Sequence, residues 1–262
     1  MFTRFKLQHK GLYSVMCLCI SVVAAFLLWT LIAKLPDISN VIVGPRQVFL
    51  ALFENLKSGY LEIQIRDSLF RVLAGFFLGF VISIPVAFLL GWYTGFRTIV
   101  EPWIQFLRTI PPIALIPLVI ALLGIGTSAK VAIIFFAVFL TMVVTIYQGV
   151  RNVDYTLIKA ARVFDATDGQ IFLHVVVPAT VPYIFTAIRL GIATALTTLV
   201  AAELTGAATG LGMMIQQAGM YFRMDVVLMG ILVIGVIGFC LDKIVLLLER
   251  ILTSWQEVKD NA

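Results

Sequence analysis

Four long stretches of this sequence contain no charged side chain, and they extend over residues 11–33, 72–96, 109–129 and 131–150. Each stretch has roughly the 20 residues that an α-helix needs to cross the hydrocarbon core of a bilayer. Helices of water-soluble domains carry polar residues on the face that meets solvent, and these stretches have no such face. The sequence therefore predicts a protein with several membrane-spanning segments.

Two further spans are predicted although charged residues interrupt them. The fifth extends over residues 179–202 and contains Arg189, and the last runs over 226–248 through Asp242 and Lys243. We expect Asp242 and Lys243 to lie near the lipid headgroups, where long basic side chains reach water. The runs are not alternating in polarity, so the expected fold is all-α, a polytopic membrane helical bundle, and not a β-barrel. A composition of 61% hydrophobic and 13% charged residues agrees with this class.

The spans and their loops are expected to form a single transmembrane domain. Its expected parts are an additional N-terminal helix at 11–35, a core bundle at 66–250 and a polar loop at 151–178 within the chain of residues 1–262. The positively charged side chains are distributed unequally over the two sides, eleven Lys and Arg on the side of the N-terminus against seven opposite. This bias predicts that both termini are cytoplasmic.

The first apolar run allows a second interpretation. Arg4, Lys6 and Lys10 precede it, as basic residues precede the apolar core of a signal peptide. The run is long, however, and lacks a clear A-x-A cleavage site, so a retained helix is favoured.

The loop at residues 151–178 is too polar at its start to cross a membrane, yet its pattern is helical. Asp154 is a plausible N-cap, and Leu157, Ala161 and Phe164 recur at helical spacing. A short amphipathic helix outside the bilayer must cover its apolar face with the membrane, its own bundle or a partner's groove. Composition does not choose among these, and a solvated connecting helix on the bundle remains an alternative.

This loop carries a recognisable motif. The segment from Lys159 to Asp165 reads K-A-A-R-V-F-D, and V-V-V-P begins ten residues after Asp165 and ends at Pro178. The spacing resembles the E-A-A-x-x-x-G-x9-I-x-L-P loop of ABC importer permeases, with Lys159 in place of Glu and Asp165 in place of Gly. Asp tolerates a left-handed backbone better than most residues, so we expect the turn to survive at Asp165.

Further blocks extend the resemblance from Ser68 to Trp255, and it is closest to the nitrate, sulfonate and taurine branch of these permeases. The blocks are S-L-F-R-V-L-A-G at 68–75, P-P-I-A-L-I-P at 111–117, G-I-G at 124–126, L-V-A-A-E at 199–203 and G-L-G at 210–212. The resemblance implies the MetI-like fold of type I ABC importer permeases, in a bacterial cytoplasmic membrane. It also implies a second permease copy, two cytoplasmic ABC ATPase subunits and an extracytoplasmic solute-binding protein.

Under this resemblance the loop becomes a coupling helix that contacts the ATPase. The expected coupling residues are Lys159, Ala160, Ala161, Arg162, Phe164, Asp165 and Asp168. Small alanines permit close approach, and charged residues suit the rim of a groove. Movement of the ATPases would then act on the adjoining spans and alternately open the pathway.

The sequence gives no support for an enzyme. It contains no G-x-x-x-x-G-K-[ST] loop, so ATP and Mg²⁺ are expected on the partner ATPase and no cofactor on this chain. Its two histidines, His9 and His174, join no catalytic or metal-binding pattern, and no metal site is expected. The chain is therefore expected to be a transport subunit without catalysis of its own.

Ionisable residues within spans are functional candidates because their burial in lipid is costly. Candidates for the translocation pathway or a gate are Arg71, Pro111, Pro112, Arg189 and Glu203. Each has a structural alternative: Arg189 can pair with a neighbour, Glu203 can be solvated at a helix end, and the prolines can simply kink the third span.

Two smaller signals complete the pattern within the spans. Pro117 is expected to contribute to the same kink as Pro111 and Pro112. Gly75 and Gly79 form a small-xxx-small pair, which indicates close packing of the second span against another helix.

The expected solute is small and anionic, an organosulfonate such as taurine, or nitrate. Related permeases make a thiamine precursor, a pyrimidine or another vitamin-type solute the alternative. An ion-coupled secondary transporter is disfavoured, because it needs carboxylates near the midplane and the spans offer Glu203 near the end of one.

Overall fold

The computed structural model describes residues 10–35 and 41–253. Arg4, Lys6, His9 and Trp255 therefore lie outside the described residues. The chain divides into two compact units. The first comprises Met1–Leu61 and Ile215–Ile231, and the second comprises Glu62–Met214 and Leu232–Ala262.

In the first unit, helix α2 (Lys10–Ile32) contacts the shorter helix α3 (Pro45–Lys57). The Trp29 indole N–H donates to the Val43 carbonyl at 3.0 Å, and the Phe26 and Phe49 rings stack with centroids 6.4 Å apart. Pro45 occupies the first turn of α3, where a helix needs no backbone donor. The same unit contains the turn between α11 (Leu211–Met220) and α12 (Met224–Leu252).

Among the described residues, five helices are long and apolar enough to span a membrane. They are α2, α4 (Tyr60–Trp92), α7 (Thr127–Arg151), the continuous segment that ends in α10 (Val177–Leu204), and α12. Four of the six predicted spans match α2, α4, α7 and α12 closely, and the fifth matches α10.

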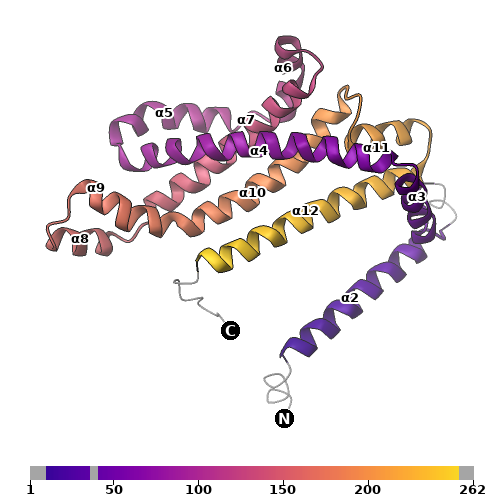
Figure 1. Ribbon diagram of the computed structural model, residues 1–262, viewed down its shortest axis with the longest axis horizontal. Helices are drawn as coiled ribbons and strands as arrows, with labels where there is room; N and C mark the ends of the chain where they lie inside the picture. The colour runs from indigo at the N-terminus through magenta and orange to yellow at the C-terminus, as the bar shows by residue number, and fades with distance from the viewer. Residues whose placement is uncertain (1–9, 36–40, 254–262) are drawn as a thin grey trace. The chain divides into compact units, whose positions relative to one another are not determined.

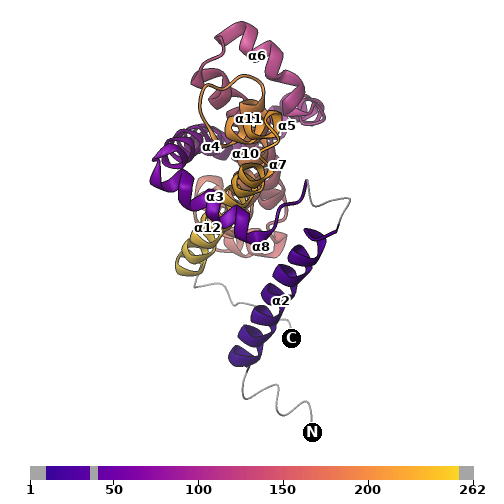
Figure 2. The same ribbon diagram turned by 90° about the vertical axis from the view of Figure 1, so that its right-hand side faces the viewer.

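The third predicted span, at residues 109–129, is not one helix. Helix α5 (Thr94–Leu107) is followed by a short 3₁₀ turn, η1 (Pro112–Leu115), and by α6 (Ile116–Leu123), with a bend of 86° between the two arms (Figures 1 and 2). The adjacent Pro111 and Pro112 provide no backbone N–H and interrupt the helix completely, which is more than the expected kink. Pro117 lies in the first turn of α6, where its missing donor has no cost.

Helices α4 and α7 run in the same direction and pack against each other from Gly75 to Gly91 of α4. A Cβ atom at Gly75 would meet Ile134, one at Gly79 would meet Val138, and one at Gly91 would meet Val150. The residue number of the contact on α7 increases together with the residue number of the glycine on α4. Both helices therefore run in the same direction. The close packing predicted for Gly75 and Gly79 is confirmed.

Helix α10 packs against α7 in the opposite direction. Gly149 on α7 lies against Tyr183, and Gly191 on α10 lies against Met142. The buried core of this unit follows the seam between α4, α7 and α10 and includes Leu90, Val138, Met142, Ile146 and Leu199.

The parallel packing of α4 and α7 fixes the role of the segment between them. Because both helices run in the same direction, the chain must return across the bundle between Trp92 and Thr127. The bent pair of α5 and α6 makes this return as a broken span, which brings the candidate spans among the described residues from five to six. Helix α12 packs antiparallel to α10, with Gly238 against Leu196, so its C-terminal end lies at the end of the unit where α7 ends.

Candidate functional site

Arg71 and Glu203, predicted separately from the sequence, form one buried ion pair. Arg71 lies on α4 and Glu203 near the end of α10, and an Nη1 to Oε1 distance of 2.6 Å joins them. Arg71 is 5% exposed and Glu203 is fully buried. In this conformation the two charges neutralise each other and are closed to a passing solute, while the buried Nε of Arg71 makes no hydrogen bond.

The ion pair belongs to a larger hydrogen-bond network. The Glu203 carboxylate also accepts from the Ser68 hydroxyl at 2.9 Å and from the Gly212 N–H at 2.8 Å. Arg71 donates in addition to the Thr209 carbonyl at 2.7 Å. Ser68 in turn accepts from the N–H of Leu211. The sequence analysis named none of these partners, because only the packing of α4 against the loop after α10 brings them together.

The network fastens the loop at residues 205–210 to α4. The Gly210 N–H donates to Gln64, and the Thr209 hydroxyl donates to Asp67, both at 2.6 Å. Gly210 has φ +127°, a conformation that L side chains rarely adopt, and a Cβ there would collide with the Glu203 carboxylate. The G-L-G block of the sequence is thus explained by close approach of the backbone to Glu203.

A third buried charge holds the other side of this loop. Lys130, near the start of α7, is 3% exposed and donates to the carbonyls of Ile125, Gly126 and Gly206 at 3.3 to 3.5 Å. Buried charges are stable only when hydrogen-bonded in this manner. Two helices, α4 and α7, therefore restrain the loop that follows α10.

The polar loop after α7 folds as predicted into a short helix, α8 (Tyr155–Val163). Its N-cap is Asp154, whose carboxylate accepts from the Thr156 N–H at 2.8 Å and whose pKa is lowered by this bond. Asp165 adopts φ +55°, which confirms the left-handed turn predicted there. A second short helix, α9 (Asp168–Ile171), follows with a capping box of Thr167 and Gln170.

The apolar residues of α8 do not share one face, contrary to the simple helical spacing. Ile158 and Ala161 pack against the bundle, in a cluster with Val150 and Ile171. Leu157 and Phe164, expected beside Ala161, are exposed. The difference arises because the helix ends at Val163, so Phe164 no longer follows its periodicity.

The outer surface of this region is unusually apolar for a polar loop. Phe164 is 84% exposed and Val163 is 80% exposed, and Tyr155 and Leu157 are also exposed. We call these four residues the α8 surface.

Charged residues border the α8 surface. The Lys159 ammonium lies over the Tyr155 ring, 4.9 Å from its centroid, so the residue that replaces the Glu of the motif stays at the surface. Arg162 and Asp168 form a solvent-exposed pair at 3.4 Å, and Ala160 and Asp165 are also exposed.

Arg189 is engaged in a contact between helices. Its Nε lies 2.7 Å from Oδ1 of Asp242 on α12, which joins α10 to α12. The pairing of Asp242, a residue expected near the headgroups together with Lys243, was not predicted. The geometry accords with the structural alternative for Arg189.

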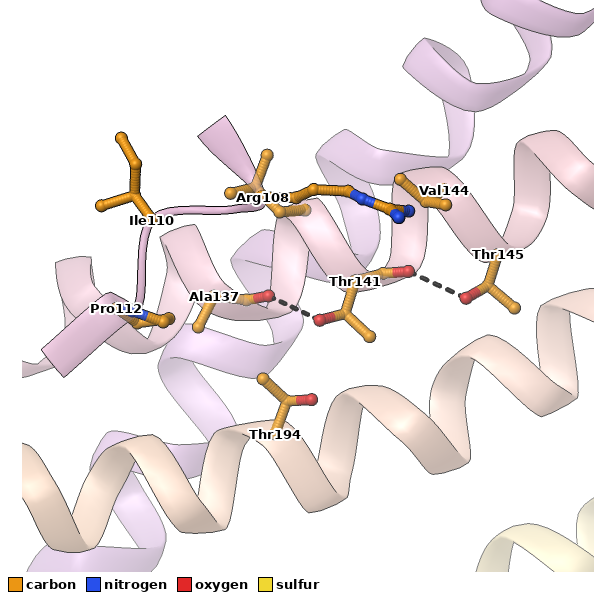
Figure 3. Close-up of a pocket in the computed structure, with 9 residues that line it drawn as sticks. Arg108, Ile110, Pro112, Ala137, Thr141, Val144, Thr145 and Thr194 are labelled. Atoms are coloured by element: carbon orange, nitrogen blue, oxygen red, sulfur yellow. Dashed lines mark hydrogen bonds between the residues drawn. The ribbon is translucent and has the colours of Figure 1, made fainter. Parts of the chain in front are cut away.

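Pro111 and Pro112 form the break between α5 and α6, and Pro112 lines a cavity of about 370 Å³ beside the middle of α7 (Figure 3). Arg108, at the C-cap of α5, also lines it, and so does Thr194 of α10. Both prolines were predicted to lie at a pathway or gate, whereas Arg108 was not predicted. The available signal was a single arginine directly before the charge-free run that contains both prolines.

Five or six candidate membrane helices among the described residues define a polytopic membrane protein. The chain belongs to the family of binding-protein-dependent transport system inner membrane components, whose sequence profile matches residues 75–254. Proteins of this family are the permease subunits of ABC importers. Their ATPase is a separate subunit.

Comparison with curated proteins gives relatives over most of the chain. A probable ABC transporter permease protein of Brucella abortus (strain 2308) is 48% identical over 217 residues, which cover 83% of this chain and 87% of the relative. The taurine transport system permease protein TauC of Escherichia coli (strain K12) is 34% identical over an alignment that covers 87% of this chain and 85% of TauC. A putative aliphatic sulfonates transport permease protein, SsuC of Bacillus subtilis (strain 168), is 33% identical, with 87% and 83% covered.

The fold also matches a solved importer. An inward-facing structure of the MetNI methionine ABC transporter aligns with a TM-score of 0.61 and 25% identity, and it covers 74% of this chain and 96% of the solved chain. The predicted MetI-like fold is confirmed. The protein is a multi-pass component of the inner membrane.

Proposed function

We propose that this chain forms the translocation pathway of an ABC importer for a small anionic solute, an organosulfonate such as taurine, or nitrate. The observation that carries the proposal is the similarity to permeases named for taurine and aliphatic sulfonates, which extends over 87% of this chain in both cases. A cavity that contains an arginine and three threonine hydroxyls supports an anion rather than a cation.

We further propose that the α8 surface docks the ATPase. Phe164 and Val163 present their apolar side chains almost fully to solvent, while the opposite face of α8 packs on the bundle. A rigid contact on both faces would transmit movement of an ATPase to α7 and α10, which flank the loop. ATP and Mg²⁺ would bind to that subunit.

For the assembly, we propose a homodimer of this chain with two ATPase subunits and one binding protein. The excess of basic residues supports a cytoplasmic position for both termini and for α8. The C-terminal end of α12 and the start of α8 lie at the same end of the second unit, which is consistent with this orientation.

The test is ATP hydrolysis by the assembled importer in nanodiscs. Its cognate binding protein is added with taurine, ethanesulfonate, nitrate or a thiamine precursor at equal concentration. The proposal predicts that a sulfonate or nitrate raises the hydrolysis rate several-fold over the unliganded binding protein. Stimulation by the thiamine precursor alone would establish the alternative solute class instead.

A further inference from the structure

The cavity beside the Pro111–Pro112 break has the position and size of a solute site. Its volume of about 370 Å³ lies at the lower end of the range for small-molecule sites, about 300–1,000 Å³. Thr141, which lines it, lies 14 residues after the start of α7 at Thr127 and ten before its end at Arg151. At 1.5 Å per residue these separations are roughly 21 Å and 15 Å, so the cavity is near the middle of the spanning helix.

Arg108 brings a positive charge to this depth without a carboxylate to balance it. By contrast, two arginines elsewhere in the bundle each have a carboxylate partner: Arg71 is paired with Glu203, and Arg189 is paired with Asp242. Within residues 10–35 and 41–253, no carboxylate oxygen lies within 4 Å of the Arg108 guanidinium. Figure 3 shows this guanidinium extended along α7 toward Val144. An arginine at mid-membrane depth is costly unless it faces water or an anion.

The hydroxyl groups in the cavity can act as donors to the same anion. Thr141, Thr145 and Thr194 each donate to the backbone carbonyl four residues earlier, all at 2.9 Å. A helix carbonyl at such a position also accepts a backbone N–H, so the hydroxyl can turn to a ligand without orphaning the carbonyl. Neither Asp nor Glu lines the cavity. The polar groups of the cavity are therefore one guanidinium and three hydroxyl groups that can turn to donate to a ligand. Such a set of donors is suited to an oxyanion.

We propose that this cavity holds the solute during its passage and that the solute is a short aliphatic sulfonate. The sulfonate oxygens accept hydrogen bonds from the guanidinium N–H groups of Arg108 and from the threonine hydroxyls. The carbon chain lies on Ile110, Pro112 and the apolar side chains of α7. Nitrate would leave the apolar part of the lining unused, and the ammonium group of taurine would find no carboxylate. This inference rests on the proposed function and narrows its solute class.

A second cavity gives the solute an onward route. It has a volume of about 270 Å³, shares Val144 with the first and is also lined by Glu101, Gln105, Gln148 and Arg151 toward the end of α7. The Glu101 carboxylate accepts from the Tyr147 hydroxyl at 3.1 Å. The two cavities therefore follow one another along α7 toward α8, and the second carries both an arginine and a carboxylate.

The test compares Arg108→Gln with Arg97→Gln in the complete importer in proteoliposomes. Arg97 lies on the same helix, α5, and does not line the cavity. Uptake of labelled ethanesulfonate and hydrolysis of ATP are measured in the same vesicles. Loss of a charge-assisted contact should lower uptake per ATP at least about tenfold in Arg108→Gln, and Arg108→Lys should recover part of it. Hydrolysis stimulated by the loaded binding protein should stay within about twofold, and Arg97→Gln should match the wild type.

Further variants keep the test decisive if Arg108→Gln does not assemble. Thr141→Val and Thr194→Val remove one hydroxyl each at nearly constant volume, and each should lower uptake per ATP about threefold. Unchanged uptake per ATP in Arg108→Gln, or in both threonine variants, overturns the site. Uptake by the wild type of nitrate or taurine more than tenfold above ethanesulfonate overturns the assigned solute. Absence of any anion uptake by the wild type refutes the proposed function itself.

Discussion

The buried pair of Arg71 and Glu203 makes a quantitative prediction about stability. Both side chains are at least 94% removed from solvent, and 2.6 Å separates their charged atoms. Arg71→Met leaves the Glu203 carboxylate buried with two neutral donors, the Ser68 hydroxyl and the Gly212 N–H. Removing one partner of a buried pair costs about 3–5 kcal/mol, mostly because the other charge remains uncompensated.

The double variant separates that penalty from simple loss of contacts. Glu203→Gln removes the charge and keeps an oxygen that can accept from Ser68 or Gly212. In Arg71→Met/Glu203→Gln neither charge remains, so its loss of unfolding free energy should be smaller than the sum of the single losses by about 2–3 kcal/mol. Gly210 and Thr209 should also lose order in the Arg71 variant, since Arg71 anchors their loop.

The assay is reversible unfolding of the purified permease in mixed detergent and dodecyl sulfate micelles, followed by circular dichroism. The matched control is Arg162→Met/Asp168→Asn, whose pair is 3.4 Å apart with side chains 67% and 75% exposed. An exposed pair should show a coupling below about 1 kcal/mol. The reasoning is refuted if the losses of unfolding free energy at Arg71 and Glu203 simply add. It is also refuted if the Arg71/Glu203 pair shows the same coupling energy as the exposed Arg162/Asp168 pair.

Three further predictions concern other parts of the chain. Phe164→Ser should weaken binding of the ATPase at least about tenfold in a pull-down titration, because the ring would be buried on docking, and unchanged binding would contradict the α8 surface. Gly79→Ala should lower unfolding free energy by about 1–3 kcal/mol through overpacking, whereas Gly235→Ala, whose Cβ meets nothing within 4 Å, should not. The hydrogen bond that Asp154 accepts lowers its pKa, so the contribution of the cap is complete at neutral pH and is lost as pH falls through that lowered pKa; the protection of the Thr156 amide against hydrogen exchange, relative to its intrinsic rate at each pH, should then fall, and an Asp154→Ala variant should lack this dependence.

Local physics explains which parts of the fold could be predicted from sequence. Lipid accepts only segments that satisfy their own backbone, so continuous apolar runs located α2, α4, α7 and α12. The cap at Asp154 and the left-handed Asp165 depend on neighbouring residues alone, and both are confirmed.

The remaining features depend on contacts far apart in sequence. Arg71 and Glu203 are 132 residues apart, and their pairing requires the packing of α4 beside the end of α10. Hydropathy could not distinguish the broken span at Pro111 from a continuous helix, because both arms are apolar. The spacing of Leu157, Ala161 and Phe164 left open what their face covers, and tertiary contacts place Ala161 against the bundle.

The most direct test of the central claim is uptake of labelled ethanesulfonate into proteoliposomes that contain this permease and its ATPase, with ATP enclosed and the loaded binding protein outside. Uptake should require both ATP and the binding protein and should stop when the ATPase is inactivated. Uptake driven by a proton or sodium gradient in the absence of ATP, ATPase and binding protein would contradict it.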